Sequence, residues 1–463
     1  MPLLTRFSKL PWLRSILCLA FALRVGAAVL VQQHVDRTGS LCLIAGDAEG
    51  YWTLARHIVL GQDYALYDPP RYVERMPGFP WLLALGIKLT AANVLAVRLL
   101  LAAVGTCACA LVYQLGRELA NRTVGLVACC LAAVSPTFIV FSVLLLSETL
   151  FAATVLASLW ALAVFVRAAP ACPVVATNGP PSGAPTVDWK WAGCALWAGA
   201  WCGVATLVRP TWIVVAPLFA VVYLFQAPLT FRRLAAVGYL LAGLAVVLAP
   251  WTIRNYRVTG HFVATTLWMG PSLYDGLSPA ATGDSNMEFV ERDGRYARRD
   301  LPDFEYQANL YYRRAAVDFA RKNPGRALEL SAHKLWRYLN PFPNAAQFRQ
   351  PAIWWGVGLF EAPVLVFAVV GAWCWLRGRT SDLNSATYSE SLRILPRTWR
   401  FRGLTWPLLL AAGPFVLFAA VHTVFVGSIR YRLPAEYALL VLTAAGLCWV
   451  AQTVWRRRAD SVS

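Results

Sequence analysis

The stretch from Thr149 to Val166 reads TLFAATVLASLWALAVFV and contains no Asp, Glu, Lys or Arg. A helix needs about 20 mostly apolar residues to cross the hydrocarbon core of a bilayer. This stretch comes close to that length, and charged residues, Glu148 and Arg167, stand directly at its two ends. It therefore predicts a transmembrane helix.

The rest of the 463-residue chain has the same character. Hydrophobic residues make up 58% of it and charged residues only 14%. In water-soluble domains, about a quarter of all residues are charged. Seven further stretches lack charged residues: Leu99–Gly116, Thr123–Ser147, Trp191–Val208, Pro210–Phe231, Leu234–Ile253, Leu404–Ile429 and Tyr437–Trp455. Two more, Trp12–Gln33 and Trp354–Leu376, contain one charge each. The sequence predicts an all-α polytopic membrane protein with about ten transmembrane helices.

The charge of the chain is strongly positive, with 42 Lys and Arg against 24 Asp and Glu. In a water-soluble protein this excess would suggest nucleic acid, but membrane proteins collect Lys and Arg in their cytoplasmic loops. With the N-terminus placed in the cytoplasm, most basic loop residues fall on the cytoplasmic side. We therefore expect a protein of the cytoplasmic membrane with both termini inside, and no binding to nucleic acid.

Three regions follow from this topology. Residues 1–253 form a transmembrane module with a first outer loop at about 34–76 and a flexible cytoplasmic linker at 168–190. Residues 254–351 form an extracytoplasmic subdomain, in which helices are predicted at 302–322 and 325–339 around the Asn323-Pro324 break. Residues 352–463 form the C-terminal transmembrane helices. The short apolar segment at 78–90 is interpreted as interfacial or re-entrant, because a span there would invert every later segment.

Two carboxylates at the outer ends of predicted spans are candidates for chemistry. Asp47 follows a span in the first outer loop, where a carboxylate can take a proton from an acceptor hydroxyl or amine. Its structural alternative is a helix N-cap, since a helical run follows it. Glu148 lies between two long apolar runs, where a charge is costly unless it faces a cavity or a partner. Its alternative is a plain loop residue.

Several arginines lie on the outer face, against the positive-inside bias, and could bind an anionic head group there. They are Arg75, Arg209, Arg254, Arg430 and Arg432. Each one alone is typical of a long side chain that snorkels from a helix end. Together with Asp47 and Glu148, they predict a polar constellation at one membrane interface.

The sequence contains no nucleotide-binding Gly-rich loop, no Cys/His cluster and no nucleophile elbow. No metal ligands are assigned and no cofactor is expected with certainty. His261 and His422 would lie on the outer side, so a divalent metal stays open as an alternative.

The order of several short motifs along the chain resembles a known family. The motifs are Asp47 with Tyr51 four residues on, Arg75-x-Pro77-Gly78-Phe79-Pro80, Ala96-Val97-Arg98-Leu99-Leu100, Ser135-Pro136, Ser147-Glu148-Thr149-Leu150-Phe151, Leu207-Val208-Arg209-Pro210, Pro250-Trp251-Thr252-Ile253-Arg254-Asn255 and Arg430-Tyr431-Arg432-Leu433-Pro434. Over nearly its whole length the chain resembles polyprenyl-phosphate-dependent membrane glycosyltransferases of the GT-C class. Within that class it is most similar to glycosyltransferase family 39, with its protein O-mannosyltransferases and aminoarabinose transferases.

The resemblance implies a GT-C-like bundle and an enzyme that transfers a hexose or pentose from a polyprenyl-phosphate donor. The acceptor would be a lipid, protein or glycan at the outer face, and the sugar would be inverted without a covalent enzyme intermediate. By resemblance Asp47 is the catalytic residue, while the relatives' second loop carboxylate has no clear match in Glu49. The residues implied in donor and acceptor binding are Tyr51, Arg75, Glu148, Arg209, Arg254, Arg430 and Arg432.

Two kinds of alternative remain open from the sequence alone. Tyr51, Trp52, Trp251 and Trp268 could stack on sugar faces or belong to the interfacial aromatic belt. The whole chain could instead be a transporter or lipid flippase, although it shows no internal repeat and its polar residues gather at one face.

Overall fold

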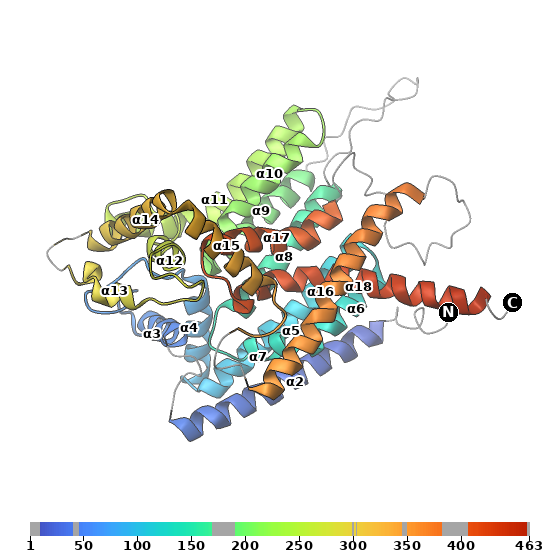
Figure 1. Cartoon of the computed structure of the whole chain (residues 1–463), viewed down its shortest axis with the longest axis horizontal. Helices are drawn as coiled ribbons and strands as arrows, with labels where there is room; N and C mark the ends of the chain where they lie inside the picture. Colours follow the sequence, from blue (N-terminus) through green and yellow to red (C-terminus); the bar gives the residue numbers. More distant parts are fainter. Residues whose placement is uncertain are drawn as a thin grey trace.

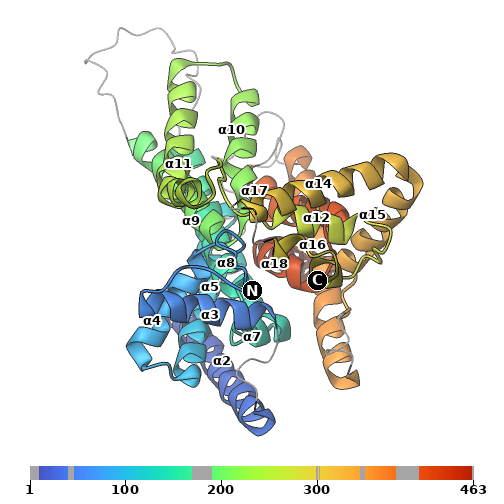
Figure 2. The same ribbon diagram turned by 90° about the vertical axis from the view of Figure 1, so that its left-hand side faces the viewer.

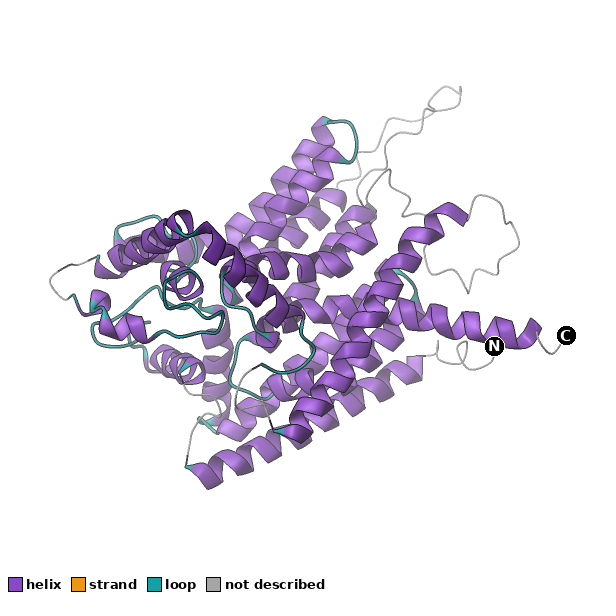
Figure 3. Cartoon of the chain, viewed as in Figure 1, coloured by secondary structure: helices purple, strands orange, loops and turns teal. Residues whose placement is uncertain are grey.

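The computed structural model of the chain describes residues 10–39, 46–168, 190–298, 301, 303–344, 350–381 and 406–460. Every regular element in this part of the chain is a helix, as Figure 3 shows; the one strand-like pairing there is an isolated bridge between Leu66 and Arg71. The linker predicted at 168–190 lies, apart from its two end residues, outside the described residues.

Eight of the described helices are long and apolar enough to cross a membrane, so the chain is a multi-pass membrane protein. These helices are α2 (Leu10–Thr38), α5 (Val94–Leu119), α8 (Glu148–Ala168), α9 (Lys190–Val208), α11 (Phe231–Thr259), α16 (Pro351–Ser381), α17 (Trp406–Val424) and α18 (Ile429–Asp460). Three shorter apolar segments are α4 (Gly78–Thr90), α6 (Arg122–Val134) and η1 with α10 (Pro210–Val214 and Val215–Phe225).

Two of the ten predicted spans are broken into shorter pieces. In the first, α6 ends at Val134 and α7 (Pro136–Phe141) begins after Ser135, whose side chain accepts a hydrogen bond from the Phe138 amide at 3.3 Å. Proline disfavours helical geometry at the residue before it, which explains the break. In the second, the segment after Arg209 begins as a 3₁₀ turn and α10 ends at Phe225. Apolar length alone did not predict either break.

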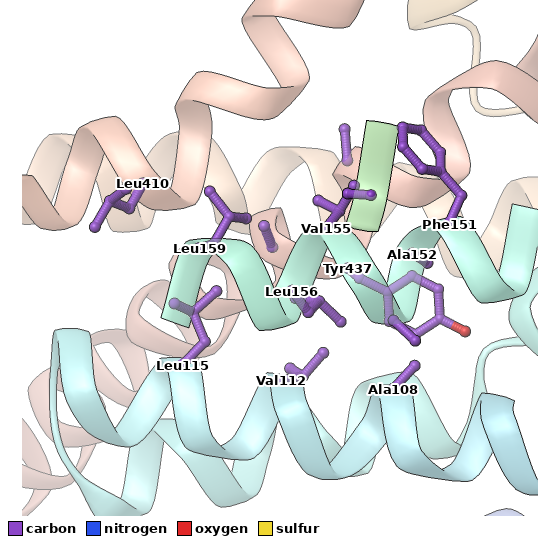
Figure 4. Close-up of a cluster of buried hydrophobic side chains, with 14 of the residues drawn as sticks. Ala108, Val112, Leu115, Phe151, Ala152, Val155, Leu156, Leu159, Leu410 and Tyr437 are labelled. Carbon is purple, nitrogen blue, oxygen red and sulfur yellow. The ribbon is translucent and has the colours of Figure 1, made fainter. Parts of the chain in front are cut away.

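Helix α8 lies at the centre of the bundle and most of its surface is buried. Figure 4 shows its apolar side chains between those of α5, α17 and α18, including Val112, Leu410 and Tyr437. Helix α18 also packs against α16, where Gly371 and Gly446 leave no room for a side chain between the two backbones. Helices α8 and α18 are therefore both closely packed within the bundle.

A small group of helices lies at one end of the bundle, together with α3 (Asp47–Leu60) and α4 (Figure 1). We call this group the loop subdomain; it comprises α12 (Met269–Gly276), α13 (Glu288–Arg292), η2 (Arg295–Ala297), α14 (Phe304–Lys322) and α15 (Pro324–Leu339). It has an aromatic core of its own around Phe289 and Tyr312. Helices α14 and α15 meet at Asn323-Pro324, where the sequence predicted a break.

Candidate functional site: an arginine–carboxylate cluster at one end of the bundle

Five of the residues singled out in the sequence meet at the end of the bundle that carries the loop subdomain. Each comes from a different segment: the start of α3, the loop before α4, the start of α8, the residue before η1 and the first turn of α18. We call them the arginine–carboxylate cluster, which consists of Asp47, Arg75, Glu148, Arg209 and Arg430.

Asp47 binds two guanidinium groups at once. Its Oδ1 lies 2.8 Å from Nη2 of Arg75, and its Oδ2 lies 2.8 Å from Nη2 of Arg430. The three side chains are partly exposed, between 18% and 28%. The carboxylate is thus fully engaged, yet it lies at a surface that a substrate can reach.

Glu148 forms the inner part of the cluster and its side chain is completely buried. Its Oε1 accepts a hydrogen bond from Nη2 of Arg209 at 2.6 Å and a second one from Nε of Arg430. Its Oε2 has no hydrogen-bond partner among the described residues. Arg430 therefore bridges the two carboxylates, with Asp47 on one side and Glu148 on the other.

Ser147 and Tyr51 complete the inner wall. Ser147 Oγ accepts a hydrogen bond from Nε of Arg209 at 3.0 Å and one from the Tyr51 hydroxyl at 3.4 Å. The guanidinium of Arg75 lies over the Tyr51 ring, 5.4 Å from its centroid. Tyr51 is thus an orienting contact of the cluster, and so is Ser147, which the sequence analysis did not single out for itself.

The N-cap alternative for Asp47 does not match the structure. Helix α3 begins at Asp47, its N-cap is Gly46, and no side chain at that cap position accepts a bond. Glu49 takes the capping role instead, because its Oε2 accepts the Gly46 amide at 3.3 Å. Asp47 is free to point at the arginines, and the carboxylate that follows it two residues later stabilises the helix start.

The charges of the cluster do not cancel. Three guanidinium groups surround two carboxylates, and Glu74 beside Arg75 is balanced by its own partner Arg71, which leaves one surplus positive charge. Burial opposes ionisation of Asp47, but Arg75 and Arg430 outweigh it and hold the pKa of its carboxyl well below the ordinary value. Burial likewise opposes the charge of Arg75, yet Asp47 raises its pKa above the ordinary value. Asp47 and Arg75 therefore stay charged at neutral pH, and the surplus positive charge of the cluster suits an anion.

Two predicted binding residues lie outside the cluster. Arg254 donates to the backbone oxygens of Tyr72 and Tyr64 at 2.6 and 3.1 Å, and so fastens the first outer loop to α11. Arg432 is fully buried and donates to the backbone oxygens of Tyr338 and Asn340 at 2.9 and 3.0 Å. It also pairs with Glu436 at 3.3 Å and lies 3.6 Å from Glu361. Both arginines hold neighbouring segments together.

The aromatic residues considered for sugar stacking are mostly packed away. Tyr51, Trp52 and Trp251 are 7%, 5% and 6% exposed, so none of them offers an open ring face. Trp268 is half-buried in the loop subdomain, with its ring centroid 5.8 Å from that of Tyr296. Of these four rings, that of Tyr51 lies against the cluster, beneath the Arg75 guanidinium.

A second ion-paired group supports the first outer loop, and the sequence analysis missed it. Glu74 is 3% exposed and lies 3.1 Å from Arg71 and 3.5 Å from Arg75. Arg71 is held between the rings of Tyr67 and Tyr296, at 4.3 and 4.1 Å from their centroids. The only feature of the sequence that could have indicated this group is the position of Glu74 directly before Arg75.

The histidines considered as metal ligands are engaged elsewhere. His261 Nε2 lies 3.2 Å from Oδ2 of Asp303, and His422 Nδ1 lies 2.7 Å from the backbone oxygen of Val426. Within the described ranges, no group of three or more His, Cys, Asp or Glu side chains is arranged to hold a metal ion.

Comparisons with known proteins agree with this architecture. Residues 70–171, which include Arg75 and Glu148, match the sequence profile of the family described as dolichyl-phosphate-mannose-protein mannosyltransferase. No curated protein matches the chain significantly.

Solved structures of an oligosaccharyltransferase have a similar fold. The oligosaccharyltransferase of Archaeoglobus fulgidus in its apo form is 14% identical, with a TM-score of 0.51 over 98% of this chain and 52% of that chain. The same enzyme tethered to an acceptor peptide with the NVT sequon is also 14% identical, with a TM-score of 0.50 over 98% and 51%. ArnT from Cupriavidus metallidurans, bound to undecaprenyl phosphate, is 16% identical, with a TM-score of 0.39 over 94% and 78%.

The chain spans about half the length of the oligosaccharyltransferase that it matches. The helical GT-C-like fold predicted from the sequence is confirmed by this likeness, and so is the resemblance in the region of residues 70–171.

Proposed function

We propose that this protein is a glycosyltransferase that moves a sugar from a polyprenyl-phosphate donor to an acceptor at the outer face of the cytoplasmic membrane. The observation that carries the proposal is the surplus positive charge of the arginine–carboxylate cluster. A polyprenyl phosphate leaves the reaction as an anion, and arginine forks bind phosphate with two parallel hydrogen bonds.

The donor phosphate would compete with Asp47 for its arginines. Arg75 and Arg430 each give Asp47 one Nη2 contact, so a phosphate that enters between them takes over both partners. Arg430 would keep its bond to Glu148 and so remain oriented. Donor binding would thus release the Asp47 carboxylate and raise its pKa from its depressed value, because the charges that lowered it are then shared with phosphate.

The released carboxylate is the proposed general base. The acceptor oxygen attacks the anomeric carbon, its proton passes to Asp47, and the bond from the anomeric carbon to the phosphate oxygen breaks. The electron pair of that bond leaves with the polyprenyl phosphate, whose charge the arginines balance. A single displacement of this kind inverts the sugar and needs no covalent enzyme intermediate.

An apolar groove beside the cluster suits the polyprenyl tail. It runs between α8, α10 and α17, with Leu162, Trp212, Leu218 and Leu409 among its lining residues. The Trp212 ring meets Phe151, and the guanidinium of Arg209 lies over Phe151 at 5.9 Å from its centroid. The groove therefore begins next to the charged cluster, as a lipid with a charged head requires.

The comparisons support the donor class and one acceptor class. The matched family profile is described by a dolichyl-phosphate sugar donor and a protein acceptor, and one of the similar structures carries an acceptor peptide. Lipid, protein and glycan all remain candidate acceptors, and both hexose and pentose remain candidate sugars. The transporter or flippase alternative is not favoured, because the matched profile is that of a sugar-transferring enzyme.

The proposed location rests on the distribution of basic residues in the sequence. Lys and Arg of the loops favour cytoplasmic termini and an extracytoplasmic cluster. The partners are then the lipid-linked donor, the acceptor and the surrounding membrane lipids, with no nucleic acid.

A cell-free transfer assay tests the proposal. Proteoliposomes with the purified protein receive a panel of radiolabelled polyprenyl-phosphate sugars and a membrane extract as acceptor. We expect label to move from at least one donor into acceptor, and Asp47→Asn protein to abolish most of that transfer. Movement of intact donor across the bilayer without sugar transfer would favour a flippase. If no donor in the panel loses its labelled sugar to acceptor, the glycosyltransferase proposal is refuted.

A further inference from the structure

Helix α15 has three different sides rather than two. The side toward the protein is buried and carries Leu330, Lys334 and Tyr338. A second side is exposed and polar, and carries Arg326, Glu329 and His333. The third side is exposed but apolar, and carries Leu328, Ala332, Trp336 and Leu339. Leu328 and Trp336 are 73% and 68% exposed, and residues spaced in this way lie on one stripe of a helix.

Contacts on its protein side place α15 beside the end of a membrane span. Tyr338 donates from its hydroxyl to the backbone oxygen of Phe415, and Lys334 Nζ donates to the backbone oxygens of Thr423 and Val424 at 3.3 and 2.7 Å. Thr423 and Val424 are the last two residues of α17, whereas Phe415 lies midway along that helix. The Lys334 contacts therefore place this part of α15 at the depth where α17 ends.

The apolar stripe continues a surface that already faces lipid. Phe342, just after α15, stacks on Trp354 at the start of α16, with ring centroids 4.0 Å apart. Trp355 and Leu359 of α16 are exposed, as a helix that faces lipid requires. Helix α15 lies between α14 and α16 in Figure 1 and at the edge of the molecule in Figure 2.

We propose that α15 is an interfacial helix, whose stripe of Leu328, Ala332, Trp336 and Leu339 lies in the head-group layer of the bilayer. A helix with a protein side, a water side and an apolar side fits this layer, where the three environments meet. Basic residues at the end of α14 and in the first turn of α15, Arg321, Lys322 and Arg326, are exposed and complement phosphate head groups.

The protein-facing side of α15 connects this helix to the candidate site through hydrogen bonds. Besides the Lys334 bonds, Arg337 Nε donates to the backbone oxygen of Gly427 at 3.1 Å. The Tyr338 and Asn340 backbone oxygens accept bonds from Arg432. These contacts hold residues 423–432, the turn from which Arg430 reaches the cluster. A lipid that seats α15 thus steadies the arginine that bridges Asp47 and Glu148.

Neighbouring residues of α15 give a matched test. Successive side chains of a helix point about 100° apart, so Leu328 lies on the apolar side and Glu329 on the polar side at nearly the same height. Single cysteines replace each residue in a chain without its 11 native cysteines and carry an environment-sensitive dye. The labelled proteins are placed in phospholipid nanodiscs with and without lipids spin-labelled near the head group.

The dye at Leu328→Cys should emit at shorter wavelength and lose emission to the spin-labelled lipid. The dye at Glu329→Cys should emit as in water and respond to an aqueous quencher instead. Ala332→Cys, on the same stripe, replaces Leu328→Cys if that variant elutes as aggregate. Equal aqueous quenching at both sites overturns the proposal, and so does a short-wavelength signal that lipid does not quench, which would mean a protein partner. The readout needs no donor or sugar transfer, so it is independent of the proposed activity.

Discussion

Asp47 meets two guanidinium groups, and this determines what its substitution should do. Asparagine keeps the shape and one oxygen acceptor but cannot take a proton. Asp47→Asn should therefore fold and bind donor, while turnover falls by roughly 10²–10⁴, the scale of losing a positioned base. Turnover is measured in the transfer assay at saturating donor.

Glu49→Gln is the matched control for Asp47→Asn. Its amide oxygen can still accept the Gly46 amide, so the helix start and the turnover should stay close to those of the unmodified protein. Near-normal transfer by well-folded Asp47→Asn would remove the proposed base, even if the enzyme class survived.

Arg430 and Arg432 are two residues apart and should fail in different ways. Arg432 is completely buried among Glu361, Glu436 and two backbone oxygens, and breaking a buried pair of this kind costs about 3–5 kcal/mol. Arg432→Met should lower the thermal midpoint clearly more than Arg430→Met, because Asp47 and Glu148 keep Arg75 and Arg209 when Arg430 is lost. Equal midpoints in detergent would contradict these separate roles.

The same two arginines show how far the sequence could go. Charge on the outer face singled out Asp47, Arg75, Glu148, Arg209 and Arg430, and the structure brings these five together. The sequence could not show that Arg430 belongs to the cluster and Arg432 does not. Residues two apart on a helix point in different directions, and the direction of each depends on how the helix is rotated in the fold. The sequence could not assign Arg254, whose partners are backbone oxygens of the first outer loop.

At the scale of elements, Glu305 of α14 fastens the first outer loop to the loop subdomain. Its carboxylate accepts the amides of Tyr72 and Val73 at 2.9 and 3.0 Å. Burial raises the pKa of Glu305 from 4.5 to about 7, against the opposing effect of those two amides. The folded protein therefore holds a proton between pH 4.5 and 7 that the unfolded chain releases, and stability falls as the pH rises through this window.

The pH dependence can be measured with Glu305→Gln. At 1.36 kcal/mol per pKa unit, the whole effect is at most about 3 kcal/mol. Thermal midpoints between pH 5 and 8 should fall more steeply in the unmodified protein than in Glu305→Gln, which cannot ionise. Parallel curves would show that Glu305 does not titrate in this range.

The elements themselves were predicted unevenly. The eight long spans and the α14–α15 break followed from apolar length and from Asn323-Pro324. The breaks at Ser135-Pro136 and after Arg209 were not predicted. A count of apolar residues takes no account of the amide hydrogen that Pro136 lacks or of the 3₁₀ turn after Arg209. The contact of Glu305 with Tyr72 joins positions more than 200 residues apart, which no local pattern can reveal.

At the scale of the whole molecule, the loop subdomain and the α10–α11 turn lie at opposite ends (Figure 1). Exposed cysteines at Ser285 and Leu229, introduced without the native cysteines, report these two ends. An impermeant thiol reagent applied to intact cells should label Ser285→Cys, while Leu229→Cys should react only after permeabilisation. The reverse pattern would place the cluster on the cytoplasmic side.

The central claim is that the arginine–carboxylate cluster holds the donor phosphate. Its most direct test is the affinity for polyprenyl phosphate of the unmodified protein, Arg75→Ala, Arg430→Ala and Asp47→Asn in nanodiscs. Loss of a charge-assisted bond costs about 1.5–3 kcal/mol, so both alanine variants should bind about tenfold to a hundredfold more weakly. Asp47→Asn should bind at least as tightly as the unmodified protein, because it removes the carboxylate that competes with phosphate. Equal affinities in all four proteins would contradict the account.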